Sequence, residues 1–348
     1  MDYSPGLRGV VAGETEISTV GMEGTSLRYR GYDAVGLTKT NTYEDVASLI
    51  IDNELDGDLF KKSFISHYNK LLEDSELIEI INRLKIEQHP MDVTRTAVSY
   101  IGEADESNKL DAASKVTAIA CLAIASYNKE PSDVLDQKYT VASSLLPNSS
   151  TQQQLEALDD MLILYAEHGF NASTFAARVT ASTRSDLISA IVSGVGTLKG
   201  ELHGGANEAA VELINSFNTP DDAKNGVHKL LEEKKKIMGF GHGVYKIQDP
   251  RSPVVKNWVE VLSTSDESVN KYEIAKVIDS IMDSEKKLFP NVDFYGGLLL
   301  SELGFAVDVF TPIFVAGRSV GWSAHYFEQR NQDTLIRPAA KYTGIQER

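Results

Sequence analysis

The chain has 348 residues, of which 42% are hydrophobic, and its 34 Lys and Arg against 50 Asp and Glu give a formal net charge of −16. This length suggests about two domains, and this acidity argues against a nucleic-acid or membrane-surface partner. The single cysteine, Cys121, excludes a disulfide framework within the chain. No apolar signal region opens the sequence and the longest apolar run, residues 116–125, is too short for a bilayer, so we expect a cytoplasmic protein.

The first 40 residues carry no helical period, and residues 15–18 and 26–29 are typical of short strands between glycines. From about residue 43 onward, apolar residues recur at i, i+3 and i+4, which predicts one helix after another. Pro90 follows a break in this pattern and is in position to open a helix.

A helix predicted for residues 110–127 is apolar nearly all round, so we expect it in the middle of a large helical body or at a subunit interface. Residues 128–152 look irregular. Further helices are expected at residues 155–165, 173–181, 187–198, 206–217, 221–238, 252–262, 272–288, 294–303 and 309–329. No alternation of strands and helices is visible, so the sequence predicts an all-α, multi-helical fold.

The segment M-G-F-G-H-G-V-Y-K-I-Q-D-P-R, residues 238–251, gathers several chemical features. Glycines on both sides of His242 leave the backbone open to a ligand, because they carry no Cβ. Gly239 follows a predicted helix and is in the position of a helix C-cap. Lys246 and Arg251 add two cations. We therefore expect this segment to contact a ligand.

Three of the seven histidines lie at element boundaries beside glycines: His168 in E-H-G-F-N, His203 in L-H-G-G-A-N-E, and His242. One such histidine is explained equally well by a turn or a cap, but three in one chain favour a shared site. A zinc site is the rival interpretation. No H-x-x-x-H or H-x-H pair places two ligands on one helix face, so we expect no metal. Structural roles are expected for the other four histidines: His67, His89, His228 and His325.

Arg318 interrupts an otherwise apolar helix, so its charge requires either a protein carboxylate or an anionic ligand, and the sequence leaves both open. Asp293 in P-N-V-D-F-Y-G-G is either a helix N-cap or a carboxylate that is free to act as a base. Arg337 precedes a proline near the C-terminus, where a solvated arginine is the ordinary expectation.

Six segments in order resemble motifs of the citrate synthase family: E-H-G-F-N-A-S-T-F, L-H-G-G-A-N-E, M-G-F-G-H-G-V-Y-K-I-Q-D-P-R, N-V-D-F-Y-G-G, G-R-S-V-G-W and R-P-A-A-K-Y-T-G. The resemblance covers nearly the whole chain and is to the short bacterial and archaeal branch. It implies a homodimer with a large domain of residues 1–203 and 299–348. A smaller inserted domain, residues 204–298, binds CoA, and the active site lies in the cleft between the two domains.

The resemblance also implies an acyltransferase reaction, in which acetyl-CoA condenses with oxaloacetate and citryl-CoA is hydrolysed, the first step of the tricarboxylic acid cycle. Acetyl-CoA is a co-substrate, and no metal or redox cofactor is implied. His203 and Asp293 resemble the pair that makes the nucleophile, and His242 resembles the acid that protonates the ketone. The residues that resemble oxaloacetate ligands are His168, Arg251, Arg318 and, from the partner subunit, Arg337. The residues assigned to CoA are Gly239, Phe240, Gly241, Gly243, Val244, Lys246 and Lys256.

Elementary chemistry agrees with these roles. A thioester α-proton is very weakly acidic, so Asp293 needs a fixed donor at the developing enolate oxygen. His203 precedes a predicted helix whose positive end disfavours an imidazolium, and burial would make Asp293 a better base.

The chain departs from the family pattern at three positions: Tyr165, where many relatives have histidine; Gly243, where many have arginine; and Ala339, where a basic residue is common. The nearest alternative function is a 2-methylcitrate synthase, which uses propionyl-CoA in the same site. A helical metallohydrolase and a non-catalytic dimeric scaffold are alternatives from other classes.

Overall fold

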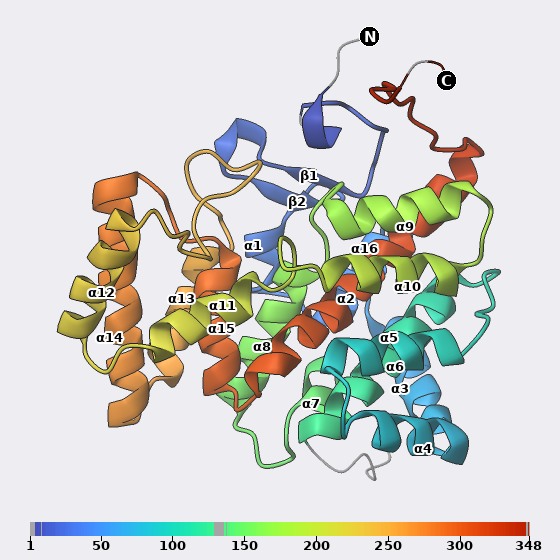
Figure 1. The fold of residues 1–348 in the computed structure, drawn as a ribbon. Coiled ribbons are helices and arrows are strands. Elements are labelled where there is room, and N and C mark those ends of the chain that lie inside the picture. The colour runs from blue at the N-terminus through green and yellow to red at the C-terminus, as the bar shows by residue number, and fades with distance from the viewer. Residues whose placement is uncertain (1–3, 8, 129–135, 137, 346, 348) are drawn as a thin grey trace.

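The computed structural model describes residues 4–7, 9–128, 136, 138–345 and 347. Sixteen α-helices and one small sheet form the described part of the chain (Figure 1), which confirms the predicted all-α fold. The α-helices are α1 (Ala34–Leu37), α2 (Tyr43–Asp52), α3 (Asp58–Leu72), α4 (Ser75–Leu84), α5 (Pro90–Tyr100), α6 (Lys109–Asn128), α7 (Val141–Leu145), α8 (Gln152–Tyr165), α9 (Ala172–Ser182), α10 (Leu187–Leu198), α11 (Ala206–Asn215), α12 (Pro220–Glu232), α13 (Ser252–Leu262), α14 (Asp266–Ile281), α15 (Val292–Glu302) and α16 (Phe310–Gln332). Short 3₁₀ turns cover Pro5–Leu7, Met22–Gly24 and Val307–Val309, and a π-helical turn covers Met282–Lys286.

The sheet has three short antiparallel strands in the order β1-β2-β3: β1 (Ser18–Val20), β2 (Leu27–Tyr29) and β3 (Tyr32–Asp33). The strand predicted at residues 26–29 is confirmed. The strand predicted at residues 15–18 is wrong by about three residues, since only Ser18 belongs to β1. The reason is a competing partner: the Glu16 amide donates to Oε1 of Glu328 (2.8 Å) instead of to a neighbouring strand.

Helix α6 lies in the middle of the helical body, as the sequence predicts, and packs against α3, α5, α7 and α16. Nearly every side chain between Ala112 and Ser126 is buried. Within the described residues, α6 is the one helix with the length and apolarity to cross a bilayer, but 78% of its most apolar stretch is buried inside the protein. These are the properties of a core helix.

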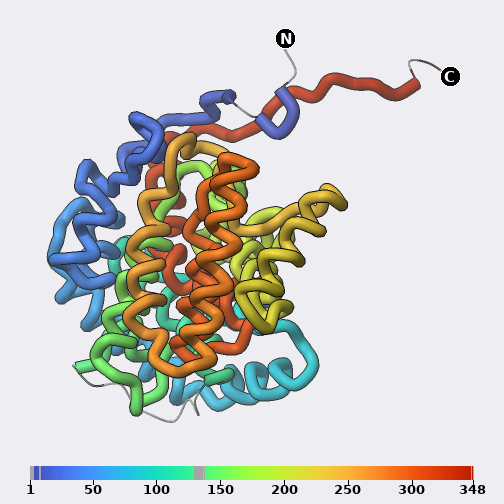
Figure 2. Tube along the Cα trace, turned by 90° about the vertical axis from the view of Figure 1, so that its left-hand side faces the viewer, coloured from blue at the N-terminus to red at the C-terminus, as the bar shows by residue number. Residues whose placement is uncertain are grey.

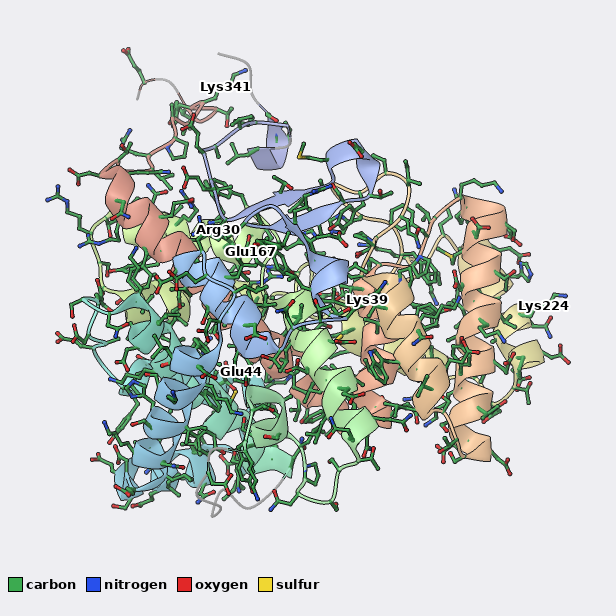
Figure 3. The ribbon with its side chains drawn as sticks, turned by 180° about the vertical axis from the view of Figure 1, so that it is seen from behind. Arg30, Lys39, Glu44, Glu167, Lys224 and Lys341 are labelled. Carbon is green, nitrogen blue, oxygen red and sulfur yellow. The ribbon has the colours of Figure 1, made fainter. Side chains whose placement is uncertain are left out.

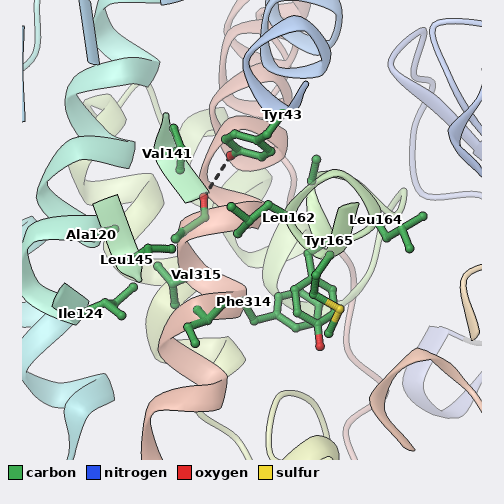
Figure 4. Close-up of a cluster of buried hydrophobic side chains, with 14 of the residues drawn as sticks. Tyr43, Ala120, Ile124, Val141, Leu145, Leu162, Leu164, Tyr165, Phe314 and Val315 are labelled. Carbon is green, nitrogen blue, oxygen red and sulfur yellow. Dashed lines mark hydrogen bonds between the residues drawn. The ribbon is translucent and has the colours of Figure 1, made fainter. Parts of the chain in front are cut away.

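Helix α16 also runs through the core and is buried along most of its length. Figure 4 shows one cluster around it, in which Phe314 and Val315 lie among Ala120 and Ile124 of α6 and Leu162 of α8. The hydroxyl of Tyr43 donates to the main-chain oxygen of Ala316 (3.0 Å). Because Arg318 lies on the same helix, its charge is held inside the protein, and only 1% of its surface is exposed.

Helices α11 to α15 form a second group that packs chiefly on itself, through the pairs α13–α15, α11–α15 and α12–α14. These helices lie at one side of the molecule in Figure 1, and Figure 2 shows them running close together. The segment after α16 extends away from the helical body (Figure 2).

The helix predicted at residues 221–238 is shorter than expected, and the assignment of Gly239 as its C-cap is wrong. Helix α12 ends at Glu232. Lys234 takes a left-handed conformation (φ +56°), and the amides of Lys234 and Lys235 close the last turn on the carbonyls of Leu231 and Leu230. This is the helix-ending arrangement that glycine usually provides. Because a lysine occupies the position, the sequence carries no stop signal there.

The irregular stretch predicted at residues 128–152 falls partly on residues 129–135 and 137, which lie outside the described residues. Its described part contains the short helix α7.

Candidate active site

A cavity of about 830 Å³ opens between the N-terminal segment, the α8–α9 turn, the loop before α15, and α16. Six of the residues singled out in the sequence line it: His168, His203, His242, Arg251, Asp293 and Arg318. Residues from distant parts of the chain therefore share one site.

His203 lies in the turn before α11, and a main-chain amide fixes its tautomer. Its Nε2 lies 3.3 Å from the amide nitrogen of Ser173 and 2.9 Å from the hydroxyl of that residue. An amide N–H can only donate, so Nε2 accepts and the proton of the neutral ring lies on Nδ1. Burial, followed by the nearby charge of Arg318, lowers the pKa of His203 to about 4. At neutral pH the ring is therefore uncharged and donates from Nδ1.

His242 has the opposite tautomer. Its Nδ1 accepts from the amides of Val244 (3.0 Å) and Tyr245 (3.1 Å), so the proton lies on Nε2. Burial, with a further contribution from Arg251, lowers the pKa of His242 to about 4, although Asp249 opposes the shift. This ring is also neutral at pH 7, and Nε2 is its donor.

Asp293 is the second residue of α15 and not its N-cap, because the side chain of Asn291 takes that position and accepts from the amide of Asp293 (3.0 Å). Among the described residues, none donates a hydrogen bond to the Asp293 carboxylate. Burial raises its pKa to about 6, with Arg251 and Arg318 opposing the shift. The cavity therefore contains a carboxylate that is free on its reactive edge and more basic than an ordinary aspartate.

Two buried arginines supply positive charge to the cavity. Arg251 makes two parallel hydrogen bonds to Asp249, from Nε (2.9 Å) and Nη2 (2.8 Å). Arg318 donates from Nε to the carbonyl of Tyr165 (2.6 Å), and its guanidinium lies 4.8 Å from the ring centre of Phe314. No carboxylate in the described residues forms an ion pair with Arg318. This favours the anionic ligand over the internal ion pair that the sequence left open.

His168 lies behind these groups, 3.0 Å from the hydroxyl of Tyr245 through Nε2, and its ring meets that of His242 edge-on at 5.1 Å. Burial, then Arg251 and His242, hold its pKa well below the ordinary value. Gly169 adopts φ +58°, which allows the chain to turn sharply after His168. The site thus contains three neutral histidines beside two arginines.

The other four histidines, for which the sequence predicts structural roles, contact groups outside the cavity. Nε2 of His325 donates to the carboxylate of Glu167 (2.9 Å), which lies in the interior of the protein (Figure 3). The remaining contacts are His67 with Asp111, His89 with the first turn of α5, and His228 with Glu285.

Only some of the residues expected to contact CoA line the cavity. Five of them line the cavity: Gly239, Phe240, Gly241, Gly243 and Val244. Lys246 is exposed, and its ammonium bonds to the carbonyl of Gly243 (3.2 Å). Lys256 lies away from the cavity, paired with Asp279 at 2.8 Å. Arg337 is exposed on the C-terminal segment and does not line the cavity of its own chain.

The sequence did not identify a role in the site for six further residues: Ser173, Lys236, Tyr245, Asp249, Asn291 and Phe314. The cap signal of Asn291 was legible in P-N-V-D, because asparagine is a preferred N-cap. The acceptor role of His203 had no sequence signal, since its partner is a main-chain amide. Within the described residues, no group of three or more His, Cys, Asp or Glu is placed to hold a metal ion.

Known proteins resemble this chain over nearly its whole length. A family model described as "Citrate synthase, C-terminal domain" matches residues 6–339. A 2-methylcitrate synthase of Shewanella oneidensis is 39% identical over 99% of this chain and 95% of its own length. The 2-methylcitrate synthase 1 of Corynebacterium glutamicum is 36% identical (99% and 96%), and a citrate synthase of Heyndrickxia coagulans is 35% identical (98% and 96%).

Solved structures are also similar. Citrate synthase from Thermoplasma acidophilum, in a ternary complex with carboxymethyl coenzyme A and oxaloacetate, has a TM-score of 0.88 and 28% identity, over 100% of this chain and 97% of that one. Citrate synthase from Thermotoga maritima has a TM-score of 0.82 and 33% identity (98% and 96%). The chain therefore belongs to the citrate synthase family of condensing acyltransferases.

Proposed function

We propose that the protein joins the carbon next to the thioester of a short acyl-CoA to the ketone carbon of oxaloacetate, and then hydrolyses the CoA thioester. One observation carries the proposal. A single cavity contains two neutral histidines with defined donor nitrogens and a carboxylate to which no described residue donates.

Asp293 removes the proton from the acyl carbon. The ordinary pKa of an aspartate is ~3.9, and the higher pKa of about 6 makes Asp293 a stronger base that is still mostly ionised at pH 7. The negative charge moves to the thioester oxygen, where the Nδ1–H of His203 donates to it. A fixed donor at a developing oxyanion is usually the largest single contribution to such a step.

His242 acts on the second substrate. Its Nε2–H donates to the ketone oxygen of oxaloacetate while the new carbon–carbon bond forms, and the proton passes to that oxygen. Arg251, Arg318 and His168 hold the two carboxylates, since a guanidinium can make two parallel hydrogen bonds to a carboxylate. The partner subunit's Arg337 completes this set in the proposed homodimer.

CoA lies against the loop of residues 239–244 in this proposal. Lys246 is exposed, and it would exchange its bond to the carbonyl of Gly243 for one to the CoA phosphates. Lys256 would first have to leave Asp279, so Lys236, which lines the cavity, is the better candidate for that role.

The proposed reaction also requires one domain to move relative to the other. Residues 204–298 form a smaller domain that closes on the rest of the chain. Closure excludes water while the enolate exists, and opening admits the water that hydrolyses the product thioester.

The acyl group is either acetyl, which gives citrate in the first step of the tricarboxylic acid cycle, or propionyl, which gives 2-methylcitrate. The names of the two relatives at 39% and 36% identity favour propionyl-CoA, whereas those of the relative at 35% identity and of the similar solved structures favour acetyl-CoA. One methylene discriminates by only ~1–3 kcal/mol, so we expect both to react at different rates.

Release of free thiol from acetyl-CoA and propionyl-CoA, each with and without oxaloacetate, tests the proposal. We expect release that requires oxaloacetate, and the larger kcat/KM identifies the acyl group. Oxaloacetate binding without thiol release from either acyl-CoA would contradict the proposed reaction and indicate a non-catalytic binding protein.

A further inference from the structure

The loop that carries His242 is paired with the segment that leads into α15. The amide of Gly241 donates to the carbonyl of Phe289 (2.8 Å), and the amide of Asn291 donates to the carbonyl of Gly239 (2.9 Å). Pro290 lies between these two bonds and, having no N–H, needs no acceptor there. The two segments therefore form a short antiparallel ladder beside the cavity.

The side chain of Asn291 adds a bridge across this ladder. Its Oδ1 accepts from the amide of Asp293 (3.0 Å), and its Nδ2 donates to the carbonyl of Gly241 (3.0 Å). That carbonyl belongs to the peptide group directly before His242. A single carboxamide thus joins the loop of the proposed acid to the helix turn of the proposed base.

Close packing leaves this loop little freedom. Gly239 has φ +84°, and a Cβ at that position would lie 2.8 Å from the Cβ of Phe294 in the first turn of α15. A second tie runs in parallel: the carboxylate of Asp249, which holds Arg251, also accepts from the amide of Val292 (3.0 Å).

Asparagine is suited to both bonds of the bridge. Aspartate and serine cap helices about as well, but aspartate has no N–H to donate and serine is too short to reach the second carbonyl. An ordinary N-cap would require only the acceptor.

We infer that Asn291 is a positioning residue, which fixes the distance between His242 and Asp293 and makes the loop, Arg251 and the start of α15 move as one unit. The inference rests on the proposed function for the roles of these two groups. It adds that one side chain sets the acid and the base relative to each other, through its hydrogen bonds to Gly241 and Asp293.

Asn291→Ser tests this inference, because serine keeps the helix cap and removes the bond to Gly241. The matched control is Asp186→Ser at the N-cap of α10, whose side chain accepts from the amide of Ser189 (2.8 Å) and which does not line the cavity. The measurements are the melting temperature, the oxaloacetate Kd, kcat, and ¹⁵N NMR of the histidine rings.

We expect Asn291→Ser to melt within a few degrees of the control and to bind oxaloacetate within about twofold of wild type. Because a misplacement of about 1 Å can cost on the order of 100-fold, kcat should fall by roughly 10- to 100-fold. The His242 spectrum should change from one tautomer, with a protonated Nε2, to a mixture.

An unchanged kcat together with an unchanged His242 spectrum would overturn the inference. If the serine variant does not fold, Asn291→Asp removes the same donor at equal length and is judged by the same His242 spectrum. A wild-type protein that releases no thiol would defeat the proposed function, while the His242 spectra would still decide whether Asn291 fixes the loop.

Discussion

At the scale of single residues, the chemistry of the site depends on which nitrogen of each histidine carries the proton. The amide of Ser173 leaves His203 a donor at Nδ1, and two amides leave His242 a donor at Nε2. Since burial lowers the pKa of both rings to about 4, neither gains a positive charge at neutral pH. Each of the two histidines can therefore donate a hydrogen bond without carrying a positive charge.

The pH dependence of the reaction should come from Asp293. Its pKa of about 6 is raised, and the group acts as a base only when ionised, so activity is lost as the pH falls through this value. We expect kcat/KM for acyl-CoA to be level above pH 7 and to fall about tenfold per pH unit below about 6. The histidines stay neutral down to about pH 4, so their titration does not change kcat/KM above that pH. An acid limb centred near 4 would contradict the assignment of Asp293.

Replacing Asp293 by asparagine removes the base and nearly preserves its shape. We expect Asp293→Asn to lower kcat by ~10²–10⁴-fold and to leave the oxaloacetate Kd nearly unchanged. Asp266→Asn, at the exposed start of α14, is the control. Turnover like that of the control would remove Asp293 from the mechanism.

Part of the site was predictable at this scale. His168, His203 and His242 stand out because each follows or precedes a glycine at an element boundary, and Arg318 because it interrupts an apolar helix. The N-cap alternative for Asp293 could not be decided from sequence, since Asn291 two residues earlier is an equally good cap. The tautomers depend on main-chain amides, of Ser173 for His203 and of Val244 and Tyr245 for His242, and such amides leave no trace in the residue pattern.

At the scale of elements, two buried carboxylates each accept a hydrogen bond from the first amide of another helix. Glu44 of α2 accepts from the first amide of α7, at Val141 (2.7 Å), and Asp159 of α8 accepts from the first amide of α2, at Tyr43 (3.1 Å). Each carboxylate has one oxygen without a hydrogen-bond partner in the described residues. Burial raises both pKa values, that of Asp159 further because of Glu44.

This pair predicts a loss of stability with rising pH. Folding favours the protonated forms of Glu44 and Asp159. The stability that these two groups contribute is therefore complete below their pKa values in the unfolded chain, and it is lost as the pH rises through their higher pKa values in the folded protein. Glu44→Gln keeps an acceptor for Val141 and removes the charge. We expect the variant to be more stable than wild type at pH 8, by on the order of 1 kcal/mol, with a smaller gain at pH 5. Thermal unfolding at both pH values checks this, and an equal change at both would contradict it.

Helix boundaries could be predicted where local sequence signals, such as a cap or a proline, mark them. Residues 187–198 and 252–262 are helical as predicted, and Pro90 opens α5. Helix α14 begins six residues before the expected residue 272, because Ser265 caps a polar first turn that shows no apolar period. The apolar pattern reports the buried face of a helix, and its solvated ends must be found from caps.

At the scale of the whole molecule, the proposed roles fall on two groups of helices. Asp293, His242 and Arg251 belong to the α11–α15 stretch, whereas His168 and Arg318 belong to the larger helical body. The resemblance to the family implied this division, which stays a prediction, and α11 to α15 pack chiefly on one another. Neither composition nor periodicity could have indicated it, since both groups are helical and similar in pattern.

A mixed dimer tests the supply of Arg337 across the subunit interface. Arg337→Ala and Asp293→Asn chains should each be inactive or weak alone. Mixed after unfolding and refolding, they should form heterodimers in which one site has both groups, so activity should rise well above that of either parent. No gain in activity at any mixing ratio would contradict the exchange of Arg337 between subunits.

The use of peptide N–H groups to hold both imidazoles has an evolutionary corollary. Every amino acid except proline offers the same donor, so the neighbours at positions 173, 244 and 245 can drift without inverting either ring. The protonation pattern is thus inherited with the path of the backbone, and it should outlast the side chains around it.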